Sequence, residues 1–508
     1  MRSVPETPED LSAGPPAAWP AGSPDDLDAR VRQDLSFLNY PPANWVPPHA
    51  PVGGVEVADV TIIGGGMCGL VAWFALRRAG VANIQILDAA PQGQEGPWLT
   101  FARMETLRSP KQLLGPAFGV PSLTFQAWYR ARFGAAAWDD LYRIPRPMWM
   151  DYLRWYRDVL QIPVENGVRV LHVDPRPDGL FSLSIDGQTA RLSRKIVLAT
   201  GRDGLGGPTI PGFMDGIERH RLWAHSSDVV DFAALRGKRV VVIGVGASAV
   251  DNAAEALEAG AAEVRLLARR PTMPTVNKLM GIGSFGVTAA YPVLPPEWRW
   301  RIMDYAARQQ TPAPHGSTLR VSRHANAHFH FNAGIDRIEE TPQGVQVTTL
   351  NGRRFQTDFV ILGTGFDIDP MTRPELAGFA DRIACWEDRY TPPPDEANPA
   401  LGRFPWLARD FGFTEKTPGT APFLGDIHCF NYGAAISVGK VSGDIPAISE
   451  GAGWLAEGIA AQLFARDLAT HWQALQDYAQ PELDGTEWRD ADAVPDAVPN
   501  AAAGVRTA

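Results

Sequence analysis

A glycine-rich turn between an apolar run and a helix-forming run constrains this fold more than any other stretch. Residues 58–69 read ADVTIIGGGMCG, in which β-branched residues stop at Gly64 and a helix-forming run starts at Met67. Gly64, Gly66 and Gly69 have the spacing G-x-G-x-x-G. The first permits a sharp turn, the second lets the backbone approach a pyrophosphate, and the third lets the helix lie close to the strand. The pattern predicts a strand–turn–helix unit whose first helical N–H groups face phosphates.

The residues after this unit supply its context. A second apolar strand, residues 84–87, ends in Asp88, nineteen positions after Gly69. An acid at that place accepts a hydrogen bond from a ribose hydroxyl in dinucleotide-binding folds. We therefore interpret residues 56–89 as a βαβ unit built for FAD, the alternative being a glycine-rich turn of some other α/β protein.

A second unit of the same kind follows later in the chain. Residues 237–260 again read strand, glycine-rich turn and helix, with a G-x-G-x-x-A pattern whose candidate cofactor contacts are Gly244, Gly246, Ser248 and Ala249. The next strand, 263–267, leads into Arg269 and Arg270 where the first unit has an acid. Because arginine accommodates a 2′-phosphate, the second unit is predicted to bind NADPH. A tandem fold that binds neither cofactor is the alternative.

Two further buried strands end in Thr-Gly. They are KIVLATG (195–201), ending in Thr200 and Gly201, and the strand in TDFVILGTGFD (357–367), ending in Thr364 and Gly365. At these ends the backbone closes over the dinucleotides. The predicted fold class is α/β, with two Rossmann-like domains, the second inserted in the first. The expected divisions are a Pro-rich arm (1–54), an FAD-binding domain (55–210 and 360–475), an NADPH-binding domain (211–359) and a flexible tail (476–508).

Composition narrows the partners and the location. The 508 residues carry a net charge of −10, which disfavours nucleic acid and anionic membranes as partners. No apolar run reaches membrane-spanning length, and the start, MRSVPETPED, lacks the features of a signal peptide. The three cysteines form no CxxC pair and no zinc spacing. We expect a cytoplasmic protein with a small-molecule substrate.

Several local expectations concern the remaining segments. The first thirty or so residues are expected to be disordered, and residues 35–48, with Phe37, Tyr40 and Trp45 between prolines, to form an extended strap on the body. Residues 149–160 are predicted to form a helix whose aromatic stripe belongs to the core. Residues 426–439 should give a strand and residues 444–464 a helix, both returning to the first domain, and the chain should fray after about residue 475.

Taken together, these motifs resemble the class B flavoprotein monooxygenases, over most of residues 56–470. Trp98, in Gly-Pro-Trp, stands where that family has a Gly-Gly-x-Trp near the flavin. LRSPK (107–111), with Arg108 and Lys111, is similar in place to a segment beside the flavin ring, and Val170 stands where members contact the FAD adenine. In PTVNK (274–278), Asn277 matches the FVNE segment of ornithine N-hydroxylases, whereas Lys278 replaces its glutamate.

The resemblance implies a mechanism. NADPH would reduce FAD, reduced flavin would react with O₂ to a C4a-(hydro)peroxide, and one oxygen atom would pass to a small polar substrate. Arg108 and Lys111 would act as electrostatic helpers, with Asn277 as the third candidate catalytic residue. Their alternative roles are solvated loop charges or partners of the FAD phosphates. The Baeyer–Villiger fingerprint is not intact around His225, because Arg219 and Arg221 occupy two of its positions.

Two reactions stay open for this chain. One is N-hydroxylation of an amine or amino acid. The other is oxidation of a heteroaromatic such as urate, since one of the two urate hydroxylase types is similar to this layout. A different class is an NADPH–flavin or disulfide reductase, which lacks its redox pair here, and a non-enzymatic flavoprotein sensor is a third. His324, His328 and His330 do not suit one face, so no metal site is predicted. A homo-oligomer is left open.

Overall fold

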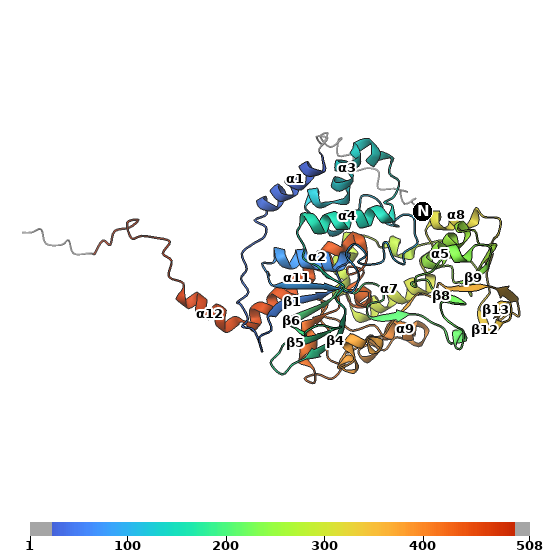
Figure 1. Cartoon of the computed structure of the whole chain (residues 1–508). Coiled ribbons are helices and arrows are strands. Elements are labelled where there is room, and N and C mark those ends of the chain that lie inside the picture. Colours follow the sequence, from blue (N-terminus) through green and yellow to red (C-terminus); the bar gives the residue numbers. More distant parts are fainter. Residues whose placement is uncertain (1–22, 493–508) are drawn as a thin grey trace, which may run out of the picture.

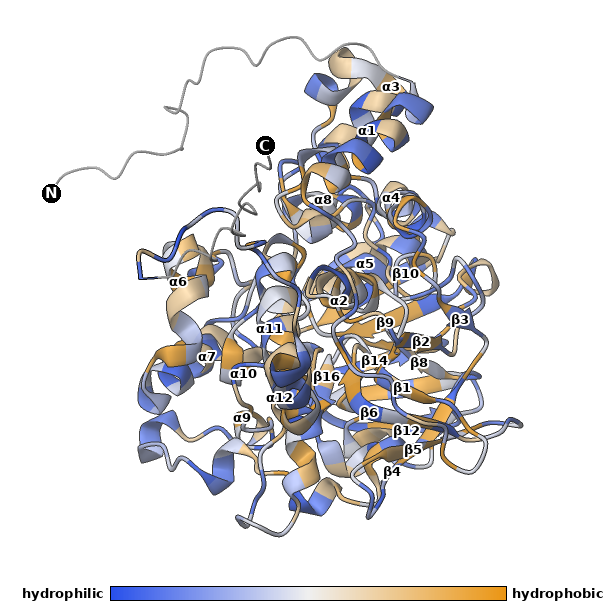
Figure 2. Ribbon diagram, turned by 90° about the vertical axis from the view of Figure 1, so that its left-hand side faces the viewer, coloured by the Kyte–Doolittle hydropathy of each residue, from blue (hydrophilic) through white to orange (hydrophobic). Residues whose placement is uncertain are grey.

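The computed structural model describes residues 23–492, which form two parallel-stranded sheets with helices packed against them (Figure 1). The first sheet has the order β3-β2-β1-β6-β5-β4, with β17 also paired to β6. Its strands are β1 (Val57–Ile63), β2 (Ile84–Asp88), β3 (Glu165–Asn166), β4 (Val170–Pro175), β5 (Phe181–Ile185), β6 (Arg191–Leu198) and β17 (Ile427–His428). Only β4 and β5 run antiparallel to their neighbours. In Figure 2, β1 is largely orange, as expected for a central strand with both faces covered.

Helices cover the first sheet in two layers. The inner pair is α2 (Met67–Arg78) and α11 (Ile448–Arg466), which pack against each other over β1. Beyond them lie α1 (Pro24–Phe37), α3 (Phe125–Asp140) and α4 (Arg146–Val159). The aromatic stripe of α4 is buried, as predicted, and Trp149, Tyr152 and Tyr156 are completely enclosed.

The second sheet is entirely parallel, in the order β11-β10-β9-β15-β8. Its strands are β8 (Trp223–His225), β9 (Arg239–Ile243), β10 (Glu263–Leu267), β11 (Ala327–His330) and β15 (Phe359–Leu362), and α5 (Ala247–Glu258) and α8 (His315–Ser322) pack beside it. A meander of β12 (Ile335–Thr341), β13 (Gly344–Thr349) and β14 (Arg354–Thr357) is attached. Because β17 returns to the first sheet, the second unit is inserted in the first, which confirms the predicted fold class.

The remaining elements connect these units. β7 (Gly206–Pro208) pairs with β16 (Phe366–Ile368) where the chain passes between the sheets. The short or peripheral helices are α6 (Phe285–Ala290), α7 (Pro296–Gln309), α9 (Pro399–Gly402), α10 (Ala435–Val438) and α12 (Leu468–Asp477). β15 ends three residues past the expected domain boundary at 359, and the division into domains stays a prediction. Within residues 23–492, no helix is both long and apolar enough to cross a membrane.

The amino-terminal arm differs from expectation. Residues 1–22 lie outside the described residues, but α1 starts at Pro24 with a capping box in which Ser23 and Asp26 satisfy each other's backbone N–H groups. Its buried stripe, Leu27, Val31 and Leu35, recurs every four residues and anchors the helix to the body. The predicted disorder is therefore wrong from residue 24 onward.

The strap is confirmed only in its later half. Tyr40 meets Phe74 edge-on at 5.2 Å, and the indole of Trp45 donates to the carbonyl of Ala79 at 2.7 Å. Phe37, at the end of α1, is instead 77% exposed. The docked strap thus begins after α1 and runs along α2.

The carboxyl-terminal return also differs in part. The predicted strand over 426–439 shrinks to β17, because Asn431 turns the chain and donates to the carbonyl of Leu198 and the hydroxyl of Thr200. The predicted helix is present as α11. The expected fraying after 475 meets a helix, α12, that continues to Asp477, and residues 493–508 lie outside the described residues.

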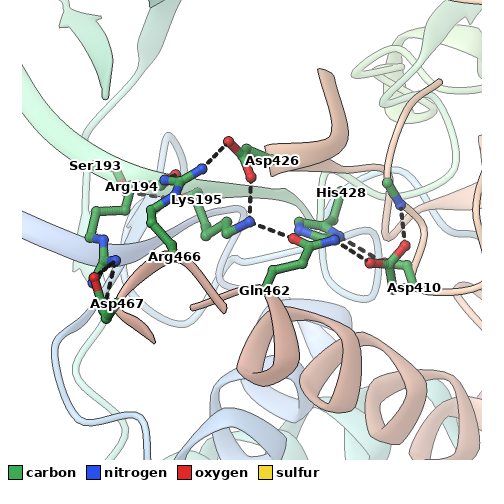
Figure 3. Close-up of polar contacts among 10 residues, drawn as sticks. Ser193, Arg194, Lys195, Asp410, Asp426, His428, Gln462, Arg466 and Asp467 are labelled. Carbon is green, nitrogen blue, oxygen red and sulfur yellow. Dashed lines mark hydrogen bonds and ion pairs between the residues drawn. The ribbon is translucent and has the colours of Figure 1, made fainter. Parts of the chain in front are cut away.

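A buried polar network joins α11 to the middle of β6 (Figure 3). Lys195, 1% exposed, donates to Asp426 and Gln462, and burial lowers its pKa against the opposing pull of Asp426. Arg194 donates to both oxygens of Asp467, at 2.7 and 2.8 Å. Buried charges persist only when paired and hydrogen-bonded, so this network fixes where α11 ends on the sheet.

Candidate cofactor and active site

Both glycine-rich turns open onto one cavity between the two sheets. Gly64 and Gly66 follow β1, Gly244 and Gly246 follow β9, and all four line the cavity. Its volume is about 2760 Å³, whereas a pocket for one drug-sized ligand measures roughly 300–1,000 Å³. Open α/β sheets bind ligands at the carboxyl ends of their strands, where this cavity lies. It has room for two extended ligands and a small third one.

The first glycine of each turn is required by the protein itself. Gly64 has φ +110° and Gly244 has φ +114°, a region that side chains rarely adopt. A Cβ on Gly64 would also lie 2.4 Å from the carbonyl oxygen of Ala199, and one on Gly244 would lie 2.7 Å from that of Gly363. These glycines therefore let each turn pass close to the end of the neighbouring strand.

The second glycine of each turn is not required by the protein. Gly66 and Gly246 cap α2 and α5 in extended conformations, with φ −71° and −72°, which any residue adopts. A Cβ on Gly66 would approach no atom closer than 3.7 Å, and one on Gly246 would meet none within 4 Å. The space that these glycines keep open borders the cavity at a helix N-terminus, where backbone N–H groups attract phosphate. Both turns thus fit a bound pyrophosphate.

The third position differs between the turns for a packing reason. A Cβ on Gly69 would lie 1.9 Å from the carbonyl oxygen of Gly64, so only glycine fits. Ala249 is tolerated because Gly363 faces it, and a Cβ on Gly363 would come within 2.3 Å of the Ala249 methyl. Neither third-position residue lines the cavity, so both act on helix–strand packing. In the second turn, Ser248 directly precedes Ala249 and does line the cavity.

Asp88 stands at the cavity wall at the end of β2. Its two carboxylate oxygens accept the N–H groups of Gly65 at 2.6 Å and Ala90 at 2.7 Å. Burial raises the pKa of this carboxyl, and the two backbone hydrogen bonds oppose the rise. Trp98 and Val170 line the same cavity. The arrangement leaves a fixed acceptor beside the first turn, as a ribose contact needs.

The two arginines after β10 have different environments. Arg270 donates to the carbonyls of Arg308 and Gln309 at the end of α7. Arg269 is exposed at the cavity wall and has no hydrogen-bond partner among the residues that the structure describes. Arg269 is therefore the better candidate for a 2′-phosphate, and Arg270 also stabilises the helix end.

The Thr-Gly strand ends lie where the chain crosses between the sheets. Thr200 donates to the carbonyl of Gly204 at 3.0 Å, and Thr364 donates to that of Thr209 at 2.5 Å. Gly201 and Gly365 have φ +84° and +87°. All four predicted residues line the cavity, so the crossing segments form its floor.

The structure separates the two candidate electrostatic helpers. Arg108 lines the cavity and donates to the carbonyl of Pro312. Burial lowers the pKa of its guanidinium, against the pull of the Asp251 carboxylate. Lys111 is not part of the cavity wall: its ammonium donates to the carbonyls of Trp138, at 2.5 Å, and Asp139, at 3.1 Å. These carbonyls end α3, where a cation is favoured by the helix dipole, so we do not carry Lys111 forward as a catalytic residue.

Four buried amide or carboxylate oxygens at the cavity have no partner within residues 23–492. One belongs to the predicted residue Asn277. The sequence analysis missed the other three, which belong to Glu450 of α11 and to a pair on α5, Asp251 and Asn252. Burial raises the pKa of Asp251, with Ser317 and Arg320 opposing. The missed pair lies three and four positions after Ser248, on the helix face that the turn presents, which is the signal that could have found it. Unpartnered buried acceptors indicate a ligand that donates N–H or O–H groups.

The histidines for which no metal site was predicted contact neighbouring side chains. His328 contacts Glu263 at 3.4 Å and His330 lies 3.1 Å from an Arg265 nitrogen. No group of three His, Cys, Asp or Glu side chains among residues 23–492 is arranged to hold a metal ion. Cys68 is buried in the first turn, and burial raises its thiol pKa to about 12, which suits a packing residue.

Comparisons with known proteins agree with this geometry. The family model described as pyridine nucleotide-disulphide oxidoreductase matches residues 61–279. A FAD-dependent urate hydroxylase from Xanthomonas campestris pv. campestris is 39% identical over 463 residues, which cover 91% of this chain and 97% of the relative.

Solved structures share the fold. The ornithine hydroxylase of Pseudomonas aeruginosa superimposes with a TM-score of 0.61 at 16% identity, over 80% of this chain and 100% of that protein. The L-lysine 6-monooxygenase of Pseudomonas syringae gives 0.59 at 19% identity, over 80% and 99%. At such identities the likeness concerns the arrangement of sheets and helices alone.

Proposed function

The chain belongs to the class B flavin-dependent monooxygenases, and from this premise we propose that it hydroxylates urate. It is an FAD-dependent oxidoreductase that uses NADPH. In the proposed reaction, one atom of O₂ enters the substrate, the other leaves as water, and NADPH supplies the two electrons. The observation that carries the substrate is the urate hydroxylase relative, which is matched over nearly its whole length.

We assign one cofactor to each glycine-rich turn. Gly66 and the start of α2 would hold the pyrophosphate of FAD, with Asp88 on its ribose and Trp98 and Val170 along its length. Gly246, Ser248 and the start of α5 would hold that of NADPH, with Arg269 on the 2′-phosphate. Bound FAD supplies the chemistry of oxygen activation; the chain positions the ligands and keeps water away from them.

The cavity wall carries groups that suit a flat, polar ring. Phe404 and Leu401 are buried and line the cavity next to Tyr432, and they offer aromatic and apolar surface to the face of a ring. Arg108 and the unpartnered oxygen of Asn277 offer a donor and an acceptor to its edge. Urate carries both carbonyl oxygens and N–H groups, so it can satisfy groups of both kinds.

A second candidate is N-hydroxylation of an amino acid or amine, and the position of Asn277 at the cavity favours it. Against it, the glutamate expected beside Asn277 is Lys278, which is exposed and of the wrong charge for an ammonium group. Cytoplasmic location and homo-oligomerisation stay predictions.

Product analysis decides between these functions. FAD-loaded protein is incubated with NADPH and ¹⁸O₂, and either urate, ornithine or lysine, and products are examined by mass spectrometry. We expect one ¹⁸O atom in the product of urate. Labelled hydroxyornithine or hydroxylysine would establish the second candidate. NADPH consumption that yields only hydrogen peroxide with every substrate would favour a reductase and refute the proposal.

A further inference from the structure

Three arginines that line the cavity have no hydrogen-bond acceptor or ion-pair partner within the described chain: Arg169, Arg202 and Arg269. The other basic side chains of the wall donate to backbone carbonyls or pair with carboxylates. Arg169 precedes Val170, at the proposed FAD adenine, and Arg269 lies at the proposed NADPH phosphate. The two cofactors therefore offer partners for two of the three cations, and Arg202 is left over.

Contacts to the crossing segment hold Arg202 in place. It directly follows Gly201, and its guanidinium carbon lies 4.3 Å from the ring centroid of Tyr432. The backbone N–H of Tyr432 donates to the carbonyl of Gly201 at 3.4 Å, so both members of the stack are tied to one strand end. The Tyr432 ring in turn meets Phe404 edge-on at 6.0 Å. The guanidinium therefore lies against the ring, and its N–H groups have no acceptor among the residues that the structure describes.

A guanidinium recognises paired oxygens lying in its own plane. It is permanently charged, and stacking on an aromatic ring reduces the freedom that it must lose on binding. Beside it, buried Phe404 and Leu401 offer an apolar surface to the face of a ring. A fixed cation edge next to an aromatic wall matches a planar anion better than an amino acid with an sp³ chain.

We propose that Arg202, stacked on Tyr432, binds the oxygen-bearing edge of a planar anionic heteroaromatic substrate. The assignment rests on the proposed function and deepens it, because urate is such an anion. A cofactor phosphate is the other source of negatively charged oxygens within reach of the cavity, and the experiment below separates the two.

The test compares four variants with the wild-type protein. Arg202→Gln removes the charge, Arg202→Lys keeps the charge but not the planar fork, and Tyr432→Leu removes the ring, whereas Tyr432→Phe retains it. The matched control is Arg409→Gln, because Arg409 stacks on Trp454 at 5.2 Å outside the cavity. For each protein, FAD content, the KM for NADPH, the KM for urate and urate binding to the oxidised protein are measured.

We expect Arg202→Gln to weaken urate binding and raise the urate KM by about tenfold or more. Arg202→Lys and Tyr432→Leu should give smaller losses. Tyr432→Phe, which retains the ring, should lose less urate binding than Tyr432→Leu, and Arg409→Gln should resemble the wild type. FAD content and the NADPH KM should stay unchanged throughout. A urate KM within twofold of wild type in Arg202→Gln would overturn the assignment, as would a loss of FAD or a raised NADPH KM in its place, since the partner would then be a cofactor phosphate.

The same measurements keep this inference apart from the proposed function. If the wild-type protein binds urate without hydroxylating it, and Arg202→Gln weakens that binding, the function is refuted and the subsite stands. If the wild type hydroxylates urate and Arg202→Gln does so equally well, the subsite alone is refuted. If the wild-type protein neither binds nor hydroxylates urate, both fail.

Discussion

Replacing Gly246 with alanine should damage NADPH binding while leaving the protein fold and FAD binding intact. The backbone at Gly246 is extended, with φ −72° and ψ 174°, and an added Cβ meets no protein atom within 4 Å. At such a site alanine stabilises the folded state by about 0.4–1 kcal/mol, since it restricts the unfolded chain. The methyl group nevertheless fills the cradle at the start of α5. Loss of one hydrogen bond to a charged phosphate costs about 1.5–3 kcal/mol, which corresponds to a roughly 10- to 150-fold rise in the dissociation constant.

The corresponding substitution in the first turn, Gly66→Ala, should weaken binding of FAD. A Cβ there comes no closer than 3.7 Å to any protein atom, so Gly66→Ala should fold but purify with little FAD. Gly316→Ala serves as the control, because Gly316 lies in α8 with no atom within 4 Å of its added Cβ and does not line the cavity. The assays are flavin absorbance per protein, the thermal unfolding midpoint, and the KM for NADPH and NADH.

Two results would refute this reasoning. A Gly246→Ala protein with a wild-type KM for NADPH would show that the glycine keeps no space for the pyrophosphate. A Gly246→Ala protein that unfolds several degrees earlier would show that the residue is needed by the protein itself.

Four further outcomes follow from described contacts. Gly363→Ala should cost about 1–3 kcal/mol of stability by overpacking against the Ala249 methyl, and adding Ala249→Gly should recover part of that loss, whereas strictly additive losses would contradict the packing argument. Lys195→Ala should lower the free energy of unfolding by about 3 kcal/mol, because it leaves the partly buried Asp426 carboxylate to Arg466 alone; an unchanged denaturation midpoint would refute the network's role. Burial lowers the pKa of His225, whose neutral ring accepts a backbone N–H and donates to a carbonyl. The unfolded state protonates His225 near pH 6.5, so the free energy of unfolding should fall below that pH by up to about 1.4 kcal/mol per pH unit. His225→Gln should flatten this dependence of stability on pH, and an equally steep dependence in the variant would contradict the argument. Arg269→Ala should raise the KM for NADPH far more than that for NADH; equal rises would remove it from the 2′-phosphate.

The parts of the fold that the sequence predicted well are those fixed by short-range sterics. The helix after the first turn starts at Met67 as expected, because Gly64 adopts a positive φ of +110° and because a Cβ on Gly69 would lie 1.9 Å from the carbonyl oxygen of Gly64. The same holds for the second turn, and for β10, whose apolar run is bounded on both sides. In contrast, α1 was missed because its Pro- and Asp-rich composition resembles disorder, and its stability comes from a four-residue stripe and a cap.

The candidate site shows the same division. The glycines proposed to contact the cofactors are recognised from their spacing, but the direction of a long side chain depends on partners far along the chain. Lys111 is turned away by carbonyls of α3, and Arg202 acquires its stacked position from Tyr432, which lies more than two hundred residues later. Neither contact has a signature in a single sequence.

The late pairing of β17 with β6 has a consequence for the order of events during synthesis. Every strand of the second sheet is contained in residues 223–362, so that unit can close as soon as it leaves the ribosome. The first sheet is completed only when residues 427–428 and α11 arrive, although its glycine-rich turn was made among the first seventy residues. The nascent chain therefore carries an open flavin cradle through most of its translation. We expect FAD to be captured near the end of synthesis, so that a chain truncated before α11 holds a folded nicotinamide unit beside an empty flavin unit.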